Sequence, residues 1–176
     1  MKTLLTQEQL RQGIERMAEE IRNHYAGRPL TMVGVLTGSV VLMADLIRLL
    51  DMPLRVALIQ AQTCTVDPDR PGPLALDVGL LACDVRDRHV LLVDDIFDTG
   101  RTLWEVVPEF DNLGAKSVHT AVLLKKKGRA EVSMQPDFAA FEIPNEFVVG
   151  YGMDYRDRYR NLPYVAALEP NERAEE

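Results

Sequence analysis

The sequence contains only two cysteines, Cys64 and Cys83, and no long hydrophobic run. Two cysteines are too few for a disulfide framework or for a cysteine-rich metal cluster. The longest uncharged apolar stretch, residues 30–44, has 15 residues and is interrupted by glycine, threonine and serine. A helix needs about 20 apolar residues to span a bilayer, so this stretch is too short. These absences exclude a disulfide-stapled secreted domain and a helical membrane protein.

Basic residues are in the minority, because 20 Lys and Arg residues stand against 27 Asp and Glu residues and give a formal net charge of −7. An acidic protein does not attract a polyanion through its overall field, so binding of bulk nucleic acid is disfavoured. The N-terminal segment MKTLLTQEQLRQG becomes polar after two leucines and lacks the apolar centre of a secretory signal. We therefore expect a cytoplasmic protein with neither a nucleic-acid nor a membrane partner.

Apolar residues are nevertheless plentiful enough for a complete core. The sequence is 47% hydrophobic and 27% charged, a composition typical of folded globular proteins and not of disordered chains. A length of 176 residues corresponds to one domain. Since no internal repeat or low-complexity linker divides the chain, we expect a single domain over residues 1–176.

Helical and strand patterns alternate along the chain. Thr6 and Gln9 have the spacing of a capping box and precede apolar residues at helical intervals. Further helical patterns cover residues 39–50 and 102–114. Apolar runs of strand length cover residues 30–36, 54–60, 74–80, 89–95 and 117–124. This alternation predicts an α/β fold with a mostly parallel sheet flanked by helices.

The most informative segment is VLLVDDIFDTGRTL, residues 90–103. Its apolar residues run directly into Asp94 and Asp95, two carboxylates that the interior of a strand would not bury unpaired. We therefore expect them at the carboxyl end of the strand, where open α/β sheets bind ligands. The alternative interpretation is an ordinary strand-to-helix turn with a solvated acidic pair.

The turn DTGRT, residues 98–102, then leads into a helix. A glycine turn at a helix start directs several backbone N–H groups to one point, and the hydroxyls of Thr99 and Thr102 add donors. Such a turn suits a phosphate dianion. Acidic side chains beside it suggest hydroxyl groups or a divalent metal on the same ligand, so the whole pattern predicts a phosphorylated sugar. The tripeptide DTG by itself is common and would fit an ordinary turn equally well.

Residues 90–103 resemble the phosphoribosyl pyrophosphate binding motif of the type I phosphoribosyltransferases. VGVLTGSVVLMADLIR, residues 33–48, is similar to the pyrophosphate-loop region of the hypoxanthine-guanine phosphoribosyltransferases. FEIPNEFVVGYGMDYRDRYRNLPY, residues 141–164, is similar to their purine-binding hood. The resemblance implies the type I fold, with a small hood formed by residues 125–168 and N-terminal residues. It also implies a flexible lid at residues 62–74, where three prolines predict an exposed loop.

The resemblance also implies the activity. The chain would transfer the 5-phosphoribosyl group from phosphoribosyl pyrophosphate to N9 of hypoxanthine and of guanine, with Mg²⁺ as cofactor, in purine salvage. Its implied phosphoribosyl contacts are Asp94, Asp95, Asp98, Thr99, Gly100, Arg101 and Thr102. Among them, Asp94 and Asp95 would hold the ribose hydroxyls directly or through Mg²⁺, and Asp98 would act as the general base near purine N7.

The remaining implied roles concern the purine and the pyrophosphate. Ile96 and Phe147 would enclose the base, and the backbone of Val148 would read its exocyclic position. Lys126 would donate to the 6-oxo group, although the run KKK leaves Lys125 as an alternative. The pyrophosphate contacts would be Thr37, Gly38 and Arg160, and Asp154 would bind a second Mg²⁺. The family further implies a homodimer or a homotetramer.

Two departures from the family pattern lie on the pyrophosphate side. The usual Leu-Lys-Gly is here Leu36-Thr37-Gly38, with a cis peptide bond implied between Leu36 and Thr37, and the expected lid lacks the usual Ser-Tyr pair. A catalytically weak, nucleotide-sensing regulator on the same fold is therefore the alternative function. The chain shows no strong basic face, which counts against that alternative. The three histidines match no ligand or triad spacing and are expected to be structural or exposed.

Overall fold

The computed structural model describes residues 1–63, 74–76 and 85–174. Most of the expected lid, residues 64–73, lies outside the described residues, as do both cysteines and the second half of the expected strand 74–80. The elements are β1 (Lys2–Leu5), α1 (Gln7–Tyr25), β2 (Leu30–Leu36), α2 (Val40–Leu49), β3 (Leu54–Thr63), β4 (Leu74–Leu76), β5 (His89–Phe97), α4 (Arg101–Asn112), β6 (Ser117–Lys126), β7 (Phe138–Ile143), β8 (Val148–Val149), β9 (Val165–Ala167) and α5 (Pro170–Ala174).

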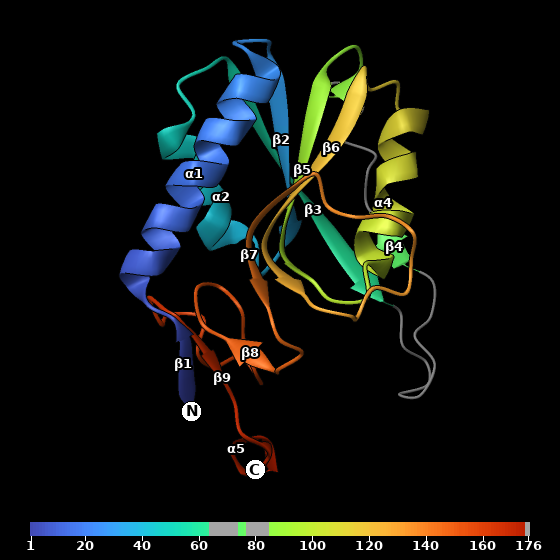
Figure 1. Ribbon diagram of the computed structural model, residues 1–176. Helices are drawn as coiled ribbons and strands as arrows, with labels where there is room; N and C mark the ends of the chain where they lie inside the picture. Colours follow the sequence, from blue (N-terminus) through green and yellow to red (C-terminus); the bar gives the residue numbers. More distant parts are fainter. Residues whose placement is uncertain (64–73, 77–84, 175–176) are drawn as a thin grey trace.

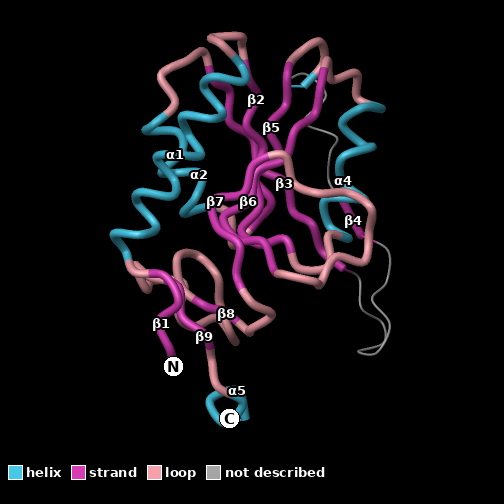
Figure 2. Tube along the Cα trace, viewed as in Figure 1, coloured by secondary structure: helices cyan, strands magenta, loops and turns pink. Residues whose placement is uncertain are grey.

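The larger sheet has the strand order β4-β3-β2-β5-β6-β7. All neighbours from β3 to β7 are parallel, and only β4 runs antiparallel to β3. The predicted mostly parallel sheet is therefore confirmed. Because β2, β5 and β6 are adjacent and parallel, their carboxyl ends lie together at one edge (Figure 2). That edge receives Leu36, the pair Asp94–Asp95 and Lys126.

Helices cover both faces of this sheet, with α1 and α2 on one side and α4 on the other (Figure 1). Successive residues of β5 point to opposite faces, so Leu91 belongs to the apolar cluster with α1 and α2, whereas Leu92 belongs to the cluster with α4. The helix residues in these clusters are Leu10, Ile14, Met17, Ile21, Leu42, Met43 and Leu46 on the first face and Leu103, Val106 and Phe110 on the second. Burial on two faces explains why the strands are continuous apolar runs.

The first helix begins as the sequence predicts. The Thr6 hydroxyl accepts a hydrogen bond from the Gln9 backbone N–H at 3.2 Å, and the Gln9 side chain accepts one from the Thr6 N–H at 2.8 Å. This capping box satisfies two N–H groups that the helix cannot satisfy itself. The helix therefore starts at a defined residue, immediately after the chain leaves β1.

A smaller antiparallel sheet, β1-β9-β8, joins the two ends of the chain below the larger one (Figure 1). The sequence analysis does not predict β1, whose Lys2 pairs with Ala167 at the other end of the chain. Residues 125–168 are divided between the two sheets, because β7 pairs with β6 in the larger one. No helix among the described residues is long and apolar enough to cross a membrane.

The three histidines, which are distant in sequence, gather around Tyr25 near the amino ends of β5 and β6. The ring centroids of His24 and His119 are 4.3 Å apart, and the Tyr25 hydroxyl lies 3.3 Å from Nδ1 of His119. Nδ1 of His89 lies 2.8 Å from the Ser117 hydroxyl. The rings of His89 and His119 are half-buried, and burial is the main cause that lowers the pKa of each.

These two rings should make the free energy of unfolding depend on pH. Unfolded histidine titrates near pH 6.5, so below this value the unfolded chain binds protons that the native chain excludes. Stability should therefore decrease as the pH falls from about 6.5 through the lower pKa values of the folded rings. Urea unfolding of the wild type and of a His89→Gln/His119→Gln variant, at about pH 7.5 and about pH 5.5, measures this contribution. Carboxylates titrate in both proteins, so an equal loss of stability in the two would contradict the assignment.

Candidate functional site

The acidic pair lies at the carboxyl end of β5, as predicted. Asp94 is only 7% exposed, and its Oδ1 accepts a hydrogen bond from the Asp95 backbone N–H at 2.9 Å. Burial, together with the neighbouring Asp95 charge, raises the pKa of Asp94 well above its usual range. Burial also raises the pKa of Asp95, although Arg160 attracts its negative charge. A bound cation would stabilise the ionised form of such a pair.

This donor set fits Mg²⁺ that is shared with a substrate. Mg²⁺ prefers hard oxygen ligands and is usually held by one or two carboxylates together with substrate oxygens and water. Among the described residues, no group of three or more His, Cys, Asp and Glu side chains could hold a metal by itself. Asp154, expected at a second Mg²⁺, pairs with Arg160, with 2.9 Å between its Oδ1 and the Arg160 Nη2. The described part of the chain therefore offers individual carboxylates to a metal that a substrate also binds.

The loop after β2 lies directly against Asp95. The peptide bond between Leu36 and Thr37 is cis, as expected. A Cβ on Gly38 would lie 1.6 Å from Oδ2 of Asp95, so this position has no room for a side chain. A Cβ on Gly152 would lie 2.4 Å from the carbonyl oxygen of Gly38, which shows that the turn at Gly152 covers the loop from the other side.

Arg160 completes this arrangement. Its Nη1 donates to the Gly152 carbonyl oxygen at 2.7 Å, while Nη2 pairs with Asp154. The structure thus brings together the predicted residues Gly38, Asp95 and Arg160, although they come from different parts of the chain. The side chain of Thr37 is exposed, so contacts from this loop would come from its backbone.

The turn of residues 98–102 begins α4. Gly100 is the N-cap with φ +83°, and a Cβ there would lie 2.5 Å from the Phe97 ring, so the turn requires glycine. The N-cap residue has no side chain to cap the helix, although the Arg101 N–H donates to the Thr99 hydroxyl at 3.4 Å, and the first turn contains no acidic residue. The turn is held from behind, because the Glu131 N–H donates to the Thr99 carbonyl oxygen at 2.9 Å and Arg101 pairs with the Glu131 carboxylate at 2.7 Å. Because these contacts do not use the remaining backbone N–H groups in the first turn of α4, those groups can bind an anion.

Asp98 lies between two cations. Lys126 Nζ is 2.6 Å from its Oδ2, and Arg129 Nε is 3.0 Å from its Oδ1. Partial burial opposes ionisation of Asp98, but the hydrogen bonds from Lys126 and Arg129 outweigh it and lower the pKa of the carboxyl group. Lys125 and Lys127 face Glu142 instead, at 3.9 and 3.5 Å. The geometry therefore favours Lys126 over Lys125 as the lysine of the site.

A cavity of about 570 Å³ opens beside Asp98. It is lined by Lys2, Asp98, Lys126, Arg129, Asn145, Glu146, Phe147, Ala167, Leu168, Glu169, Pro170 and Arg173. Phe147 is 38% exposed and meets Tyr155 edge to face, with 5.4 Å between the ring centroids. Of the described residues expected beside the base, Ile96 and Val148 do not line this cavity, because Ile96 packs against the core and Val148 is buried in β8.

Two arginines of this cavity are absent from the sequence-based site. Arg129 follows the lysine run and reads in sequence as part of a solvated basic segment. Arg173 belongs to α5, and its guanidinium lies 5.5 Å from the Phe147 ring centroid. Only the pairing of β9 with β1 and β8 brings α5 to this cavity, and no local pattern in the sequence predicts that pairing.

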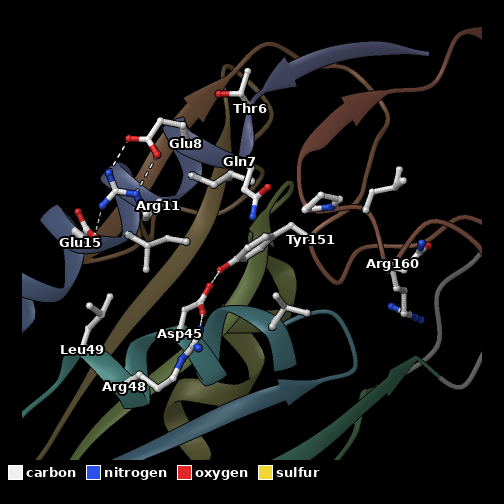
Figure 3. A pocket seen from close by; sticks show the side chains of 16 residues that line it. Thr6, Gln7, Glu8, Arg11, Glu15, Asp45, Arg48, Leu49, Tyr151 and Arg160 are labelled. Carbon is white, nitrogen blue, oxygen red and sulfur yellow. Dashed lines mark hydrogen bonds and ion pairs between the residues drawn. The ribbon is translucent and has the colours of Figure 1, made fainter.

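A larger cavity of about 880 Å³ lies between α1, α2 and residues 160–163 (Figure 3). The Tyr151 hydroxyl donates to Asp45, and Asp45 also pairs with Arg48. Of the predicted site residues, only Arg160 lines this cavity. The larger cavity therefore does not coincide with the predicted site, whereas Asp98, Lys126 and Phe147 line the smaller one.

Comparisons with known proteins agree with this geometry. Residues 1–156 match the phosphoribosyl transferase domain family. A hypoxanthine-guanine phosphoribosyltransferase of Streptococcus pneumoniae is 34% identical over 168 residues, which cover 96% of this chain and 93% of that protein. A bifunctional protein TilS/HprT of Listeria innocua is 37% identical over 169 residues, and there the match spans 96% of this chain but only 26% of the relative.

The fold agrees as well. The structure of a hypoxanthine phosphoribosyltransferase from Trypanosoma cruzi, solved as a ternary substrates complex, superposes with a TM-score of 0.88 at 33% identity, covering 99% of this chain and 98% of that one. A family match over most of the chain and full-length relatives above 30% identity lead to the same assignment. The chain belongs to the phosphoribosyltransferase family, in its hypoxanthine-guanine branch.

Proposed function

We propose that this chain transfers the 5-phosphoribosyl group of phosphoribosyl pyrophosphate to N9 of hypoxanthine and of guanine, releasing pyrophosphate and forming IMP or GMP in purine salvage. The observation that carries the proposal is the common sheet edge. There the acidic pair, the start of α4, the enclosed Gly38 and the Asp98–Lys126 pair meet at the ends of β2, β5 and β6. The streptococcal relative carries this activity in its name.

The phosphoribosyl side is formed by β5 and the start of α4. Asp94 and Asp95 accept from the ribose hydroxyls, and the backbone of residues 98–102 donates to the 5′-phosphate, with the hydroxyls of Thr99 and Thr102 beside it. The negative charge of the phosphate is favourable there because the helix start is positive and carries no competing acidic side chain.

The leaving pyrophosphate is held at the Gly38 loop and Arg160. Bond cleavage at C1 creates positive charge on the ribose and negative charge on pyrophosphate. The carboxylates of β5 tolerate the first charge, and Arg160 and the backbone of the Gly38 loop stabilise the second. When bound with the substrate, Mg²⁺ supplies further neutralisation of the pyrophosphate. Asp94 and Asp95 are the residues that would hold it, and we place Asp154 at a second ion.

The base side is the cavity beside Asp98. Phe147 forms one wall of this cavity, whereas Ile96 and Val148, which the sequence predicts beside the base, do not line it. Lys126 is 10% exposed and has three N–H donors, so it can donate to a 6-oxo group while it remains near Asp98. An adenine amino group cannot accept a hydrogen bond from this ammonium as a 6-oxo group can, which favours 6-oxopurines. Asp98 accepts the N7 proton of the base.

The smaller sheet would serve as the hood, because β8 continues directly from Phe147 and β9 carries the chain to Arg173. We assign residues 1–176 to this single domain and place the protein in the cytoplasm. The regulator alternative rests on the two departures on the pyrophosphate side, and the turnover assay distinguishes it from the enzyme.

Turnover should be measured with hypoxanthine, guanine, xanthine and adenine, each with phosphoribosyl pyrophosphate and Mg²⁺. We expect turnover of hypoxanthine and guanine.

Asp98→Asn should lower the turnover of hypoxanthine about 10²-fold or more, because proton transfer by a positioned group contributes a factor of about 10²–10⁴ to the rate. The affinity for phosphoribosyl pyrophosphate should change little. Turnover of no base would favour the regulator, and a wild-type rate in Asp98→Asn would refute its role as the base.

Lys126→Ala should reduce kcat/KM for 6-oxopurines by about 10-fold to 100-fold, the usual effect of losing a hydrogen bond from a charged group. Lys127→Ala is the matched control, because Lys127 is 65% exposed and faces Glu142. Steady-state kinetics with hypoxanthine compare the two variants. A larger effect from Lys125→Ala than from Lys126→Ala would show that the register is wrong by one residue.

We also propose that the chain assembles as a homodimer or a homotetramer. Helix α2 supports this, because it exposes Val40 and Ile47, which are 42% and 39% accessible. Sedimentation at micromolar concentration should show a species larger than 19.8 kDa. Val40→Glu/Ile47→Glu should shift the equilibrium towards the monomer, because burying a carboxylate in an apolar contact is costly. A monomer in the wild type would contradict the proposal.

A further inference from the structure

Four cationic side chains follow one another at the end of β6, and they divide into two pairs. Lys125 and Lys127 face Glu142. Lys126 and Arg129 both face Asp98, the first at Oδ2 and the second at Oδ1. Each oxygen of the Asp98 carboxylate therefore has its own charged donor, so its orientation is fixed from two directions.

Lys126 and Arg129 differ in whether they are expected to donate a hydrogen bond to the substrate. Lys126 lies inside the cavity and is the donor assigned to the 6-oxo group of the base. Once a base accepts from this ammonium, its interaction with Asp98 Oδ2 is weakened. The Arg129 side chain is 41% exposed, compared with 10% for Lys126, and its Nε bonds to Oδ1 and not to the Oδ2 that Lys126 contacts.

We propose that Arg129 is a positioning residue, which holds the Asp98 carboxylate through Oδ1 while Lys126 turns to the base. This inference rests on the proposed function of the same site. A guanidinium suits the task because its donors are planar and fixed, whereas an ammonium rotates among several acceptors. Asp98 thereby keeps its place beside N7 even when its other oxygen is released to receive the proton.

The other charged groups around the cavity do not replace Arg129. Lys2, Glu146, Glu169 and Arg173 line the cavity with Asp98, but the hydrogen bonds found for the Asp98 side chain among the described residues come from Lys126 and Arg129. Glu131, which neighbours Arg129 in sequence, is engaged by Arg101. Removal of Arg129 should therefore leave Asp98 with Lys126 as its one strong donor.

The test compares Arg129→Met, Arg129→Lys and Lys127→Met. Arg129→Met and Lys127→Met remove the same charge at neighbouring positions, but only the first touches Asp98. NMR titration of the Asp98 carboxyl carbon in the free protein should show a higher pKa in Arg129→Met, an intermediate value in Arg129→Lys and the wild-type value in Lys127→Met. The acidic limb of kcat/KM for hypoxanthine should move upward in the same order.

The kinetic constants distinguish positioning from a structural role. Arg129→Met should lower kcat at neutral pH by at least about tenfold, while KM for phosphoribosyl pyrophosphate stays within about twofold. Equal Asp98 titration in Arg129→Met and Lys127→Met would overturn the inference, as would a lower kcat that Arg129→Lys does not partly restore. Absence of turnover in the wild type would overturn the proposed function instead, and it is seen separately because the titration needs no turnover.

Discussion

Strand β5 has β2 on one side, β6 on the other and helices on both faces, so its residues from Val90 to Val93 are fully buried. A strand in this position can present polar groups only where it ends. The carboxylates of Asp94 and Asp95 are therefore forced to the edge where the neighbouring parallel strands also end. The loop after β2 and the end of β6 meet them there for the same reason. The burial of β5 therefore determines where the polar residues of the site come together.

Charge balance at this edge is local, since the whole chain is acidic. The carboxylates of β5 are disfavoured by burial, whereas Asp98, only a few residues later, is kept ionised by Lys126 and Arg129. The pKa values of neighbouring acids in one segment are therefore shifted in opposite directions, because other elements surround them differently. A bound cation would stabilise the ionised pair Asp94–Asp95, whereas the ionised carboxylate of Asp98 is suited to accept a proton.

Local patterns in the sequence predict the central part of the fold. The capping box at Thr6, the apolar runs of the parallel strands and the turn at Gly100 depend on residues close together in sequence, and the structure contains each of them. β1 was not predicted, because its partner β9 lies at the other end of the chain. The contacts of Arg173 depend on the same long-range pairing, whereas the contact of Arg129 with Asp98 and the histidine cluster depend on β5 lying beside β6. Residues 64–73 of the expected lid, which was predicted at residues 62–74, lie outside the described residues.

The loop after β2 contains two neighbouring positions with opposite tolerance for change. The side chain of Thr37 is exposed, whereas Gly38 is enclosed between Asp95 and the turn at Gly152. Random substitution can therefore alter position 37 without moving the carboxylate of β5, but any side chain at position 38 displaces it. A lineage can lose the lysine usual in this family and keep the shape of the loop. The departure from the family pattern occurs at Thr37, the position of the pair where a substitution does not disturb the contacts at the sheet edge.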